Sequence, residues 1–274
     1  YTQNIPPVSV FTADIYGADN QNWSVTQTRD GTMFFANSKG LLKYDGERWE
    51  LLGSINNTIL RSVHAKENDV YTGAYMEFGV WTLNEQNQYI YQSLSQGLDL
   101  IEDEQFWNIT TFNEHYIIFQ SLDAIYIYNT NNESFEVLKS DTEYTKMVIS
   151  NDILYVHEKD KGLFKLINGS KVPVNTSDII KSSTFINIYD INDRLYIQTQ
   201  QNGILRIDGK KELNLTNADN LFTDLSVYSS LQMENGDIYL GTISNGLIKI
   251  SNGRVAQQLN QENVLSNNTV LNLF

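Results

Sequence analysis

A short phrase recurs six times along this chain of 274 residues. Each copy has a glycine, once an alanine, followed by a segment in which apolar and polar residues alternate, as in residues 162–166. The glycine or alanine stands at positions 40, 79, 124, 162, 203 and 246, so the steps are 39, 45, 38, 41 and 43 residues. A period of about 40 residues built from short strands is typical of a β-propeller, with one four-stranded blade per repeat.

Each repeat contains the same order of segments. In the first repeat an apolar segment, 23–27, is followed by the turn Asp30-Gly31 and a second apolar segment, 33–35. The glycine phrase then opens a third strand, and a more polar segment, 48–51, comes last. Asn, Asp and Gly at the turns tolerate the positive φ that tight hairpins need. This order matches a blade whose inner strands are apolar and whose outer strand faces solvent at the rim.

We therefore predict a single all-β domain over residues 1–274, a β-propeller with six complete blades and a partial seventh, from a parent protein with seven. Residues 1–22 are expected to supply a strand that closes the ring and hides its edges. Residues 267–274 resemble the first strand of the incomplete blade. The six blades are expected at about 23–55, 56–98, 103–141, 143–180, 183–222 and 225–266.

Composition restricts the partners of the segment. The net charge of −14 repels phosphate, so nucleic acid is not expected as a partner. The chain has no cysteine, which excludes disulfides and thiol-ligated metal. No apolar run approaches the roughly 18 residues that a membrane span requires, so we expect no membrane contact by this segment.

Catalytic motifs are missing from the sequence. It has no phosphate-binding glycine loop, no nucleophile elbow and no zinc-protease helix motif. The three histidines, His64, His115 and His157, are scattered, and the acidic run at 102–104 is expected to be solvated. We predict a segment that is not an enzyme and has no catalytic residue, cofactor or metal site.

One set of residues stands out when the blades are aligned by their second strands. The alignment places one residue per blade at the start of the innermost strand, and these residues should form a ring at one mouth of the central channel. Aromatic faces stack on sugars while Arg binds hydroxyl or carboxylate groups, so the ring is a candidate ligand site. Packing between neighbouring blades is the alternative explanation. The column is Trp23, Arg61, Trp107, Thr145, Ile186 and Tyr228.

A second candidate cluster, Tyr75 and Glu77 with Trp81, lies on a loop between strands of the second blade. A packing role for this loop is again the alternative.

Residues 20–46, with Asp30-Gly31 and Asp45-Gly46, resemble the two-component-regulator propeller repeat, and 57–63 and 71–79 strengthen the match. The resemblance is sharp over 20–81. It implies the periplasmic sensor domain of a bacterial membrane-bound regulator, followed by a triple-tyrosine domain, a transmembrane helix and either a LuxR-type helix-turn-helix or a histidine kinase. In hybrid members of that family the signals are often oligosaccharides.

The resulting hypothesis is a ligand-sensing domain that recognises an oligosaccharide or another small ligand and contacts the downstream triple-tyrosine domain. Two alternatives remain. A dimerisation scaffold without a small ligand, working as a homodimer, would be favoured by a broad exposed apolar patch. A propeller lyase or glycosidase would be favoured by a carboxylate pair at the channel mouth.

Overall fold

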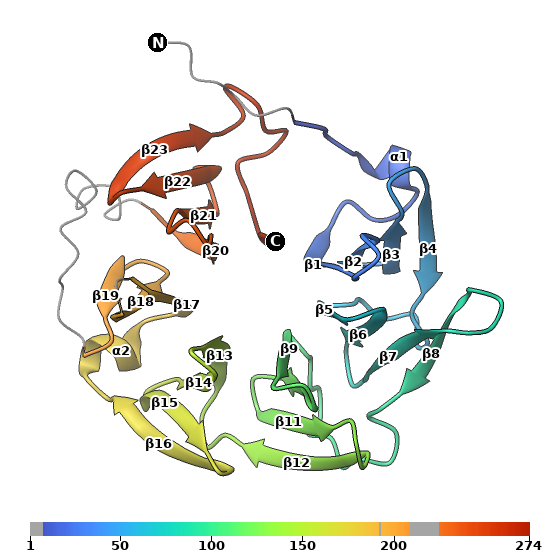
Figure 1. The fold of residues 1–274 in the computed structure, drawn as a ribbon, viewed down its shortest axis with the longest axis horizontal. Helices are drawn as coiled ribbons and strands as arrows, with labels where there is room; N and C mark the ends of the chain where they lie inside the picture. The colour runs from blue at the N-terminus through green and yellow to red at the C-terminus, as the bar shows by residue number, and fades with distance from the viewer. Residues whose placement is uncertain (1–7, 192, 209–224) are drawn as a thin grey trace.

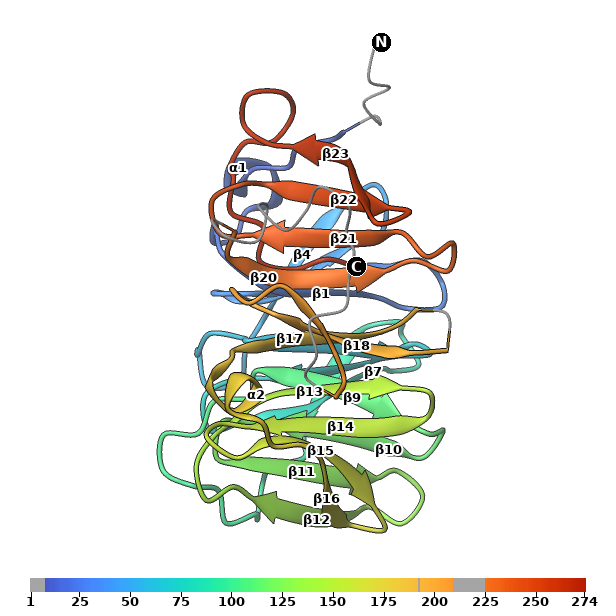
Figure 2. The ribbon, with the colours of Figure 1, turned by 90° about the vertical axis from the view of Figure 1, so that its left-hand side faces the viewer.

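The computed structural model describes residues 8–191, 193–208 and 225–274. Six antiparallel sheets in these residues surround a central channel, which confirms the predicted all-β propeller with six blades (Figure 1). Seen from the side, the strands run roughly along the axis of the ring (Figure 2).

Consecutive strands pair within each blade, and the innermost comes first in sequence (Figure 1). Blade five has three described strands, and its predicted outer strand lies outside the described residues. Blades one to three comprise β1 (Asn22–Gln27), β2 (Met33–Asn37), β3 (Gly40–Tyr44), β4 (Trp49–Gly53), β5 (Ser62–Lys66), β6 (Asp69–Gly73), β7 (Phe78–Leu83), β8 (Tyr89–Ser93), β9 (Asn108–Phe112), β10 (Tyr116–Gln120), β11 (Ala124–Asn129) and β12 (Ser134–Lys139). Blades four to six comprise β13 (Tyr144–Ser150), β14 (Ile153–Glu158), β15 (Gly162–Ile167), β16 (Ser170–Asn175), β17 (Phe185–Asp190), β18 (Leu195–Thr199), β19 (Ile204–Arg206), β20 (Val227–Gln232), β21 (Ile238–Thr242), β22 (Leu247–Ser251) and β23 (Arg254–Leu259).

The glycine phrase marks a point where two strands approach too closely for a side chain. A Cβ added at Gly162 would lie 2.4 Å from the backbone oxygen of Asn175 in the neighbouring outer strand, and the φ of Gly162 is +113°. Gly79 has no positive φ, yet a Cβ there would lie 2.3 Å from the oxygen of Gln92. These glycines therefore lie where the third and fourth strands of a blade are in close contact.

Hydrophobic clusters join each blade to the next. From blade one to blade six, each pair of consecutive blades shares a buried cluster. In blade order the clusters include Phe34 with Trp81, Phe78 with Phe119, Ile118 with Val156, Leu163 with Ile197 and Tyr189 with Leu240. Between blades six and one, the described residues form no such cluster. That junction instead contains a cavity of about 650 Å³, lined by Val10, Phe35 and Val270 among others.

The predicted ring-closing strand is not present in residues 8–21. This segment contains the short helix α1 (Ala13–Tyr16) and no strand, and residues 1–7 lie outside the described residues. Tyr16 packs with Leu42, and Phe11 contacts the rings of Tyr44 and Trp49. The aromatic side chains thus hold the segment against blade one instead of letting it pair with blade six. A second helix, α2 (Asp178–Ser182), precedes blade five.

The C-terminal residues, predicted as the first strand of a seventh blade, do not form a strand. The Val270 amide donates to the Thr242 carbonyl, and the Gly246 amide donates to that of Asn268, so the segment is bound to blade six. It then turns to the central channel (Figure 1), where Leu271 and Phe274 line the cavity described below.

Candidate functional site

The six residues of the predicted column all line one cavity in the channel, of about 600 Å³. A β-bulge at the start of four innermost strands leaves a single residue unpaired, namely Trp23, Thr145, Ile186 and Tyr228. Arg61 and Trp107 occupy the same place in their blades. The Arg61 amide donates to the carbonyl of Gly73, which already pairs with Ser62. The Trp107 amide donates to the carbonyl of Gln120, which already pairs with Asn108. Bulges redirect side chains, and here they direct one per blade to the channel. Sequence reasoning found the column but not the bulge.

Arg61 lies beside two tryptophans, whose rings contact each other edge to face with centroids 6.2 Å apart. Its Cζ is 4.3 Å from the ring centroid of Trp23 and 4.7 Å from that of Trp107. Its Nε donates to the side-chain oxygen of Gln105 at 2.9 Å, and burial lowers the pKa of Arg61, a change that nearby Tyr228 opposes. A guanidinium in this position gains cation–π attraction from both rings and keeps its planar face fixed.

Lys146 is a cation in the same cavity that sequence reasoning missed. It follows the bulged Thr145 in β13, and its Nζ donates to Asn108 Oδ1 at 3.0 Å. Asn108 in turn donates to Gln120, whose amide donates to the Tyr144 carbonyl. Burial lowers the pKa of Lys146. In a regular strand successive side chains alternate, so only one of residues 145 and 146 would point to the channel. Because of the bulge, both residues line the cavity.

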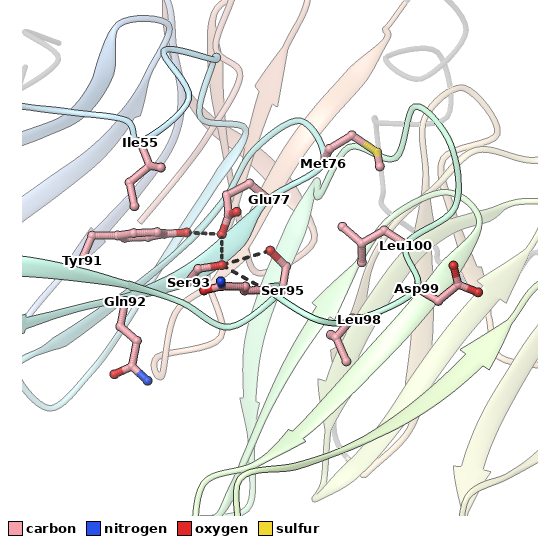
Figure 3. Close-up of a pocket in the computed structure, with 11 residues that line it drawn as sticks. Ile55, Met76, Glu77, Tyr91, Gln92, Ser93, Ser95, Leu98, Asp99 and Leu100 are labelled. Atoms are coloured by element: carbon pink, nitrogen blue, oxygen red, sulfur yellow. Dashed lines mark hydrogen bonds between the residues drawn. The ribbon is translucent and has the colours of Figure 1, made fainter.

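The second predicted pair, Tyr75 and Glu77, lies away from the channel cavity. Glu77 accepts hydrogen bonds from Tyr91 at 2.8 Å and Ser93 at 2.7 Å, beside a cavity of about 910 Å³ (Figure 3). Burial raises the pKa of the Tyr91 phenol, and the Glu77 carboxylate adds to this effect. These two hydroxyl groups are the side-chain partners of Glu77 among the described residues.

Tyr75 has an indirect link to the candidate site. Its hydroxyl donates to Asp103, and its backbone forms an isolated β-bridge with Gln105, the residue whose side chain holds Arg61. Tyr75 therefore helps to place the partner of Arg61 without lining the cavity.

The acidic run at 102–104 is only partly solvated, so the expectation was wrong for Glu104. This residue is 0% exposed and accepts hydrogen bonds from the Ser121 hydroxyl at 2.6 Å and the Tyr126 hydroxyl at 2.7 Å. Its backbone neighbour Ile101 donates a third, at 3.0 Å. The two hydroxyl partners come from blade three, 17 and 22 residues further along the chain, which the local charge pattern does not reveal.

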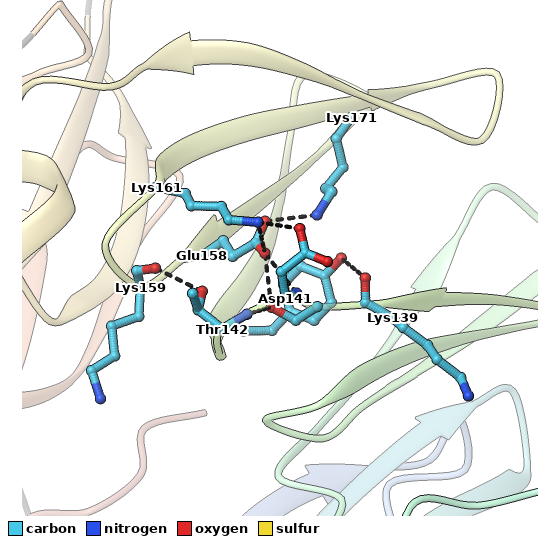
Figure 4. Close-up of polar contacts among 9 residues, drawn as sticks. Lys139, Asp141, Thr142, Glu158, Lys159, Lys161 and Lys171 are labelled. Atoms are coloured by element: carbon cyan, nitrogen blue, oxygen red, sulfur yellow. Dashed lines mark hydrogen bonds and ion pairs between the residues drawn. The ribbon is translucent and has the colours of Figure 1, made fainter.

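Glu158 is a second buried carboxylate, and it has lysine partners (Figure 4). It lies 2.7 Å from Nζ of Lys171 and 3.1 Å from that of Lys161, and it accepts a hydrogen bond from Ser140 at 2.8 Å. Burial alone would raise the pKa of Glu158, but the hydrogen bonds from Lys171, Ser140 and Lys161 outweigh it and lower the pKa to about 2. Asp141 also pairs with Lys161, so two carboxylates balance two lysines in this cluster.

The described residues contain no group of three or more His, Cys, Asp or Glu side chains placed to hold a metal ion. They also include no helix long and apolar enough to cross a membrane.

Comparisons with known proteins place the fold. No family model matches the chain, and no curated protein matches it. It is similar to two structures of the extracellular domain of BT4673 from B. thetaiotaomicron, described as a one-component system in one case and as a hybrid two-component system in the other. Both give a TM-score of 0.67, with 19% and 18% identity. The matches cover 91% and 92% of this chain but 35% of that domain, so the chain spans about a third of its length.

Other propellers are similar at lower identity. Virginiamycin B lyase from Staphylococcus aureus gives a TM-score of 0.63 at 11% identity, covering 87% of this chain and 83% of its own. The WD40 propeller domain of Doa1 gives 0.63 at 14%, covering 89% and 83%. At these identities the likeness establishes the propeller fold alone.

Proposed function

We propose that this propeller is a non-enzymatic, extracytoplasmic ligand-sensing domain of a transmembrane signalling protein, and that it binds a glycan at the channel mouth. The observation that carries the proposal is the position of Arg61 against the contacting rings of Trp23 and Trp107 in a cavity of about 600 Å³. The similarity to the BT4673 extracellular domain supports the sensor role.

The chemistry of the mouth suits a sugar. Trp23 and Trp107 are half-buried and Tyr228 is 41% exposed, so parts of three aromatic rings are accessible beside a fixed guanidinium. Sugars place their C–H faces on such rings, while polar side chains around them bind hydroxyl groups. Asn108, Thr145 and Gln200 are polar neighbours in the same lining.

The lining argues for binding over hydrolysis. A glycosidase needs two carboxyl groups at the scissile bond. Among the described residues that line this cavity there is no Asp or Glu side chain. The lyase and glycosidase alternatives therefore lack the feature that would have favoured them.

Signalling would follow from a population shift. A ligand that holds blades one, two and three together at Trp23, Arg61 and Trp107 would favour one geometry between the propeller and the domain that follows it. Such a shift requires different ligand affinities for the two geometries. The downstream triple-tyrosine domain and a signalling output inside the cell belong to this proposal.

The test is a glycan screen by calorimetry with the purified domain, followed by Trp107→Ala and Arg61→Ala on every hit. Loss of a central aromatic should weaken binding about thirtyfold, or about 2 kcal/mol. Trp49→Ala, an equal change on outer strand β4, is the matched control and should leave affinity unchanged. Thermal melts check that each variant folds. If both channel variants bind a hit as tightly as the parent, the ring only packs and the proposal fails.

A further inference from the structure

The channel cavity has the opposite charge to the rest of the chain. The chain carries 33 Asp and Glu against 19 Lys and Arg. The described lining of the cavity, by contrast, includes Arg61 and Lys146 but no Asp or Glu side chain. Two cations in a low-dielectric channel produce a local positive field that the distant surface acids screen only weakly.

Both cations have N–H groups that no hydrogen bond or ion pair occupies among the described residues. Arg61 uses Nε for Gln105, and among the described residues neither of its terminal nitrogens has a hydrogen-bond or ion-pair partner. Lys146 makes one hydrogen bond, to Asn108, and no ion pair within the same part of the chain. Both cations are half-buried, and a counter-charge would offset the cost of their partial desolvation. These two have aromatic rings and amides, and no anion.

The acids that could neutralise Arg61 and Lys146 are engaged elsewhere. Asp103 accepts the Tyr75 hydroxyl, and Glu104 accepts those of Ser121 and Tyr126. Glu158, at the end of the strand that pairs with β13, is held by two other lysines.

Another titratable group of the lining, His64, does not alter this charge. His64 is a neutral member, since burial lowers its pKa to about 4 and its Nε2 contacts the Thr111 hydroxyl.

We propose that the ligand of the channel is anionic, and that Arg61 and Lys146 together bind its carboxylate or sulfate group while Trp23, Trp107 and Tyr228 contact its apolar face. This inference rests on the proposed glycan site and specifies the class of glycan as acidic. The planar fork of Arg61 suits two-point binding of an oxyanion, and Lys146 adds a point charge.

The first experiment needs no knowledge of the sugar. In a Trp49→Phe background, the accessible tryptophan fluorescence comes mainly from Trp23 and Trp107, because Trp81 is 5% exposed. The ratio of the iodide to the caesium quenching constant should be at least about twice that of free N-acetyltryptophanamide at equal ionic strength, since the channel concentrates anions. Lys146→Gln should lower this ratio, and Lys139→Gln, the same charge change on exposed β12, should not. A parent ratio no higher than that of the free tryptophan derivative would overturn the proposal.

The second experiment uses matched probes. Oligogalacturonides are compared with their methyl esters, and dextran sulfate with dextran, so that each pair differs in charge on one backbone. We expect one acidic member to bind and its neutral partner to bind about tenfold more weakly or not at all. Arg61→Gln and Lys146→Gln should each weaken binding about tenfold, and Lys139→Gln should have no effect. Which pair responds distinguishes carboxylate from sulfate.

The outcomes separate the two proposals. Binding of neutral members that Trp107→Ala weakens and Lys146→Gln does not would refute the anionic inference and keep the glycan site. Binding of acidic members that is insensitive to Trp107→Ala, Arg61→Gln and Lys146→Gln would refute both.

Discussion

Two regions of this propeller hold buried charge in opposite ways. In the cluster around Glu158 (Glu158, Lys161, Lys171 and Ser140), a carboxylate that is 0% exposed has two lysines and a hydroxyl as partners. In the channel, Arg61 and Lys146 have aromatic rings and amides but no carboxylate. We infer that a charged group paired with counter-charges stabilises the fold. Cations without a counter-charge are available to bind a ligand.

The two regions are close neighbours in the same blade. Tyr144 at the start of β13 pairs with Glu158 at the end of β14, and Lys146 lies two residues further along β13. Blade four therefore has a neutralised acid on its second strand and a cation without a counter-charge on its innermost strand. The structural charge is fully buried and paired, whereas the candidate functional cations are half-buried and have no counter-charge among the described residues.

The largest effect is expected for Glu158→Gln. The change leaves Lys161 and Lys171 without their buried acid, and breaking a buried pair on one side should lower the free energy of unfolding by about 3 kcal/mol. Glu143→Gln is the control, because Glu143 and Lys159 form an exposed pair whose loss should have little effect on the free energy of unfolding. Urea unfolding of both variants measures this. Equal losses would show that the Glu158 cluster is no more structural than a surface pair.

The second prediction concerns acid. The pKa of Glu158 is lowered from 4.5 to about 2 in the folded state, so its stabilisation is present above pH 4.5 and is lost as pH falls through 2. The difference in unfolding free energy between the parent and Glu158→Gln should therefore shrink by about 2 kcal/mol between pH 7 and pH 3. Urea titrations at each pH provide the measurement. A difference that stays constant down to pH 2 would contradict the lowered pKa.

A smaller effect is expected when the hairpin that carries Glu158 is distorted. Glu158 pairs with Gly162 across β14 and β15, and a Cβ at Gly162 would collide with the Asn175 carbonyl. Gly97 also has a positive φ, but nothing lies within 4 Å of an added Cβ there. Gly162→Val should thus cost about 1–2 kcal/mol more than Gly97→Val, and melting curves compare them. Equal melting temperatures would mean that the close approach is not rigid.

The sequence predicted the ring but not its details, for physical reasons. Strand order and turn chemistry are local, so the blades and the column through Trp23 and Arg61 could be aligned from the repeat. Whether Glu104 is buried depends on hydroxyl groups from the next blade, and local charge patterning indicated solvent instead. Lys146 was missed because a bulge shifts the strand alternation. The closing strand was predicted wrongly for residues 8–21 because the contacts of Phe11 and Tyr16 with blade one decide its path.

The smallest effect is expected for Lys146→Met, and it tests the comparison most directly. The ammonium is buried, its pKa is lowered, and its one hydrogen-bond partner, Asn108, faces the channel. Replacing it removes a desolvated charge and one hydrogen bond, so stability without ligand should change by less than about 1 kcal/mol. Lys171→Met is the matched change in the Glu158 cluster.

Lys171→Met should cost more, about 1–2 kcal/mol, because it takes one of two cations from a buried carboxylate. Urea unfolding of both variants, without ligand and at one ionic strength, supplies the comparison. If Lys146→Met destabilises the domain as much as Lys171→Met does, Lys146 is part of the framework, and the channel loses the free cation on which its assignment as an anion site depends. If Lys146→Met leaves the free energy of unfolding unchanged or raises it, Lys146 does not stabilise the fold. That result is expected of a lysine whose role is to bind a ligand.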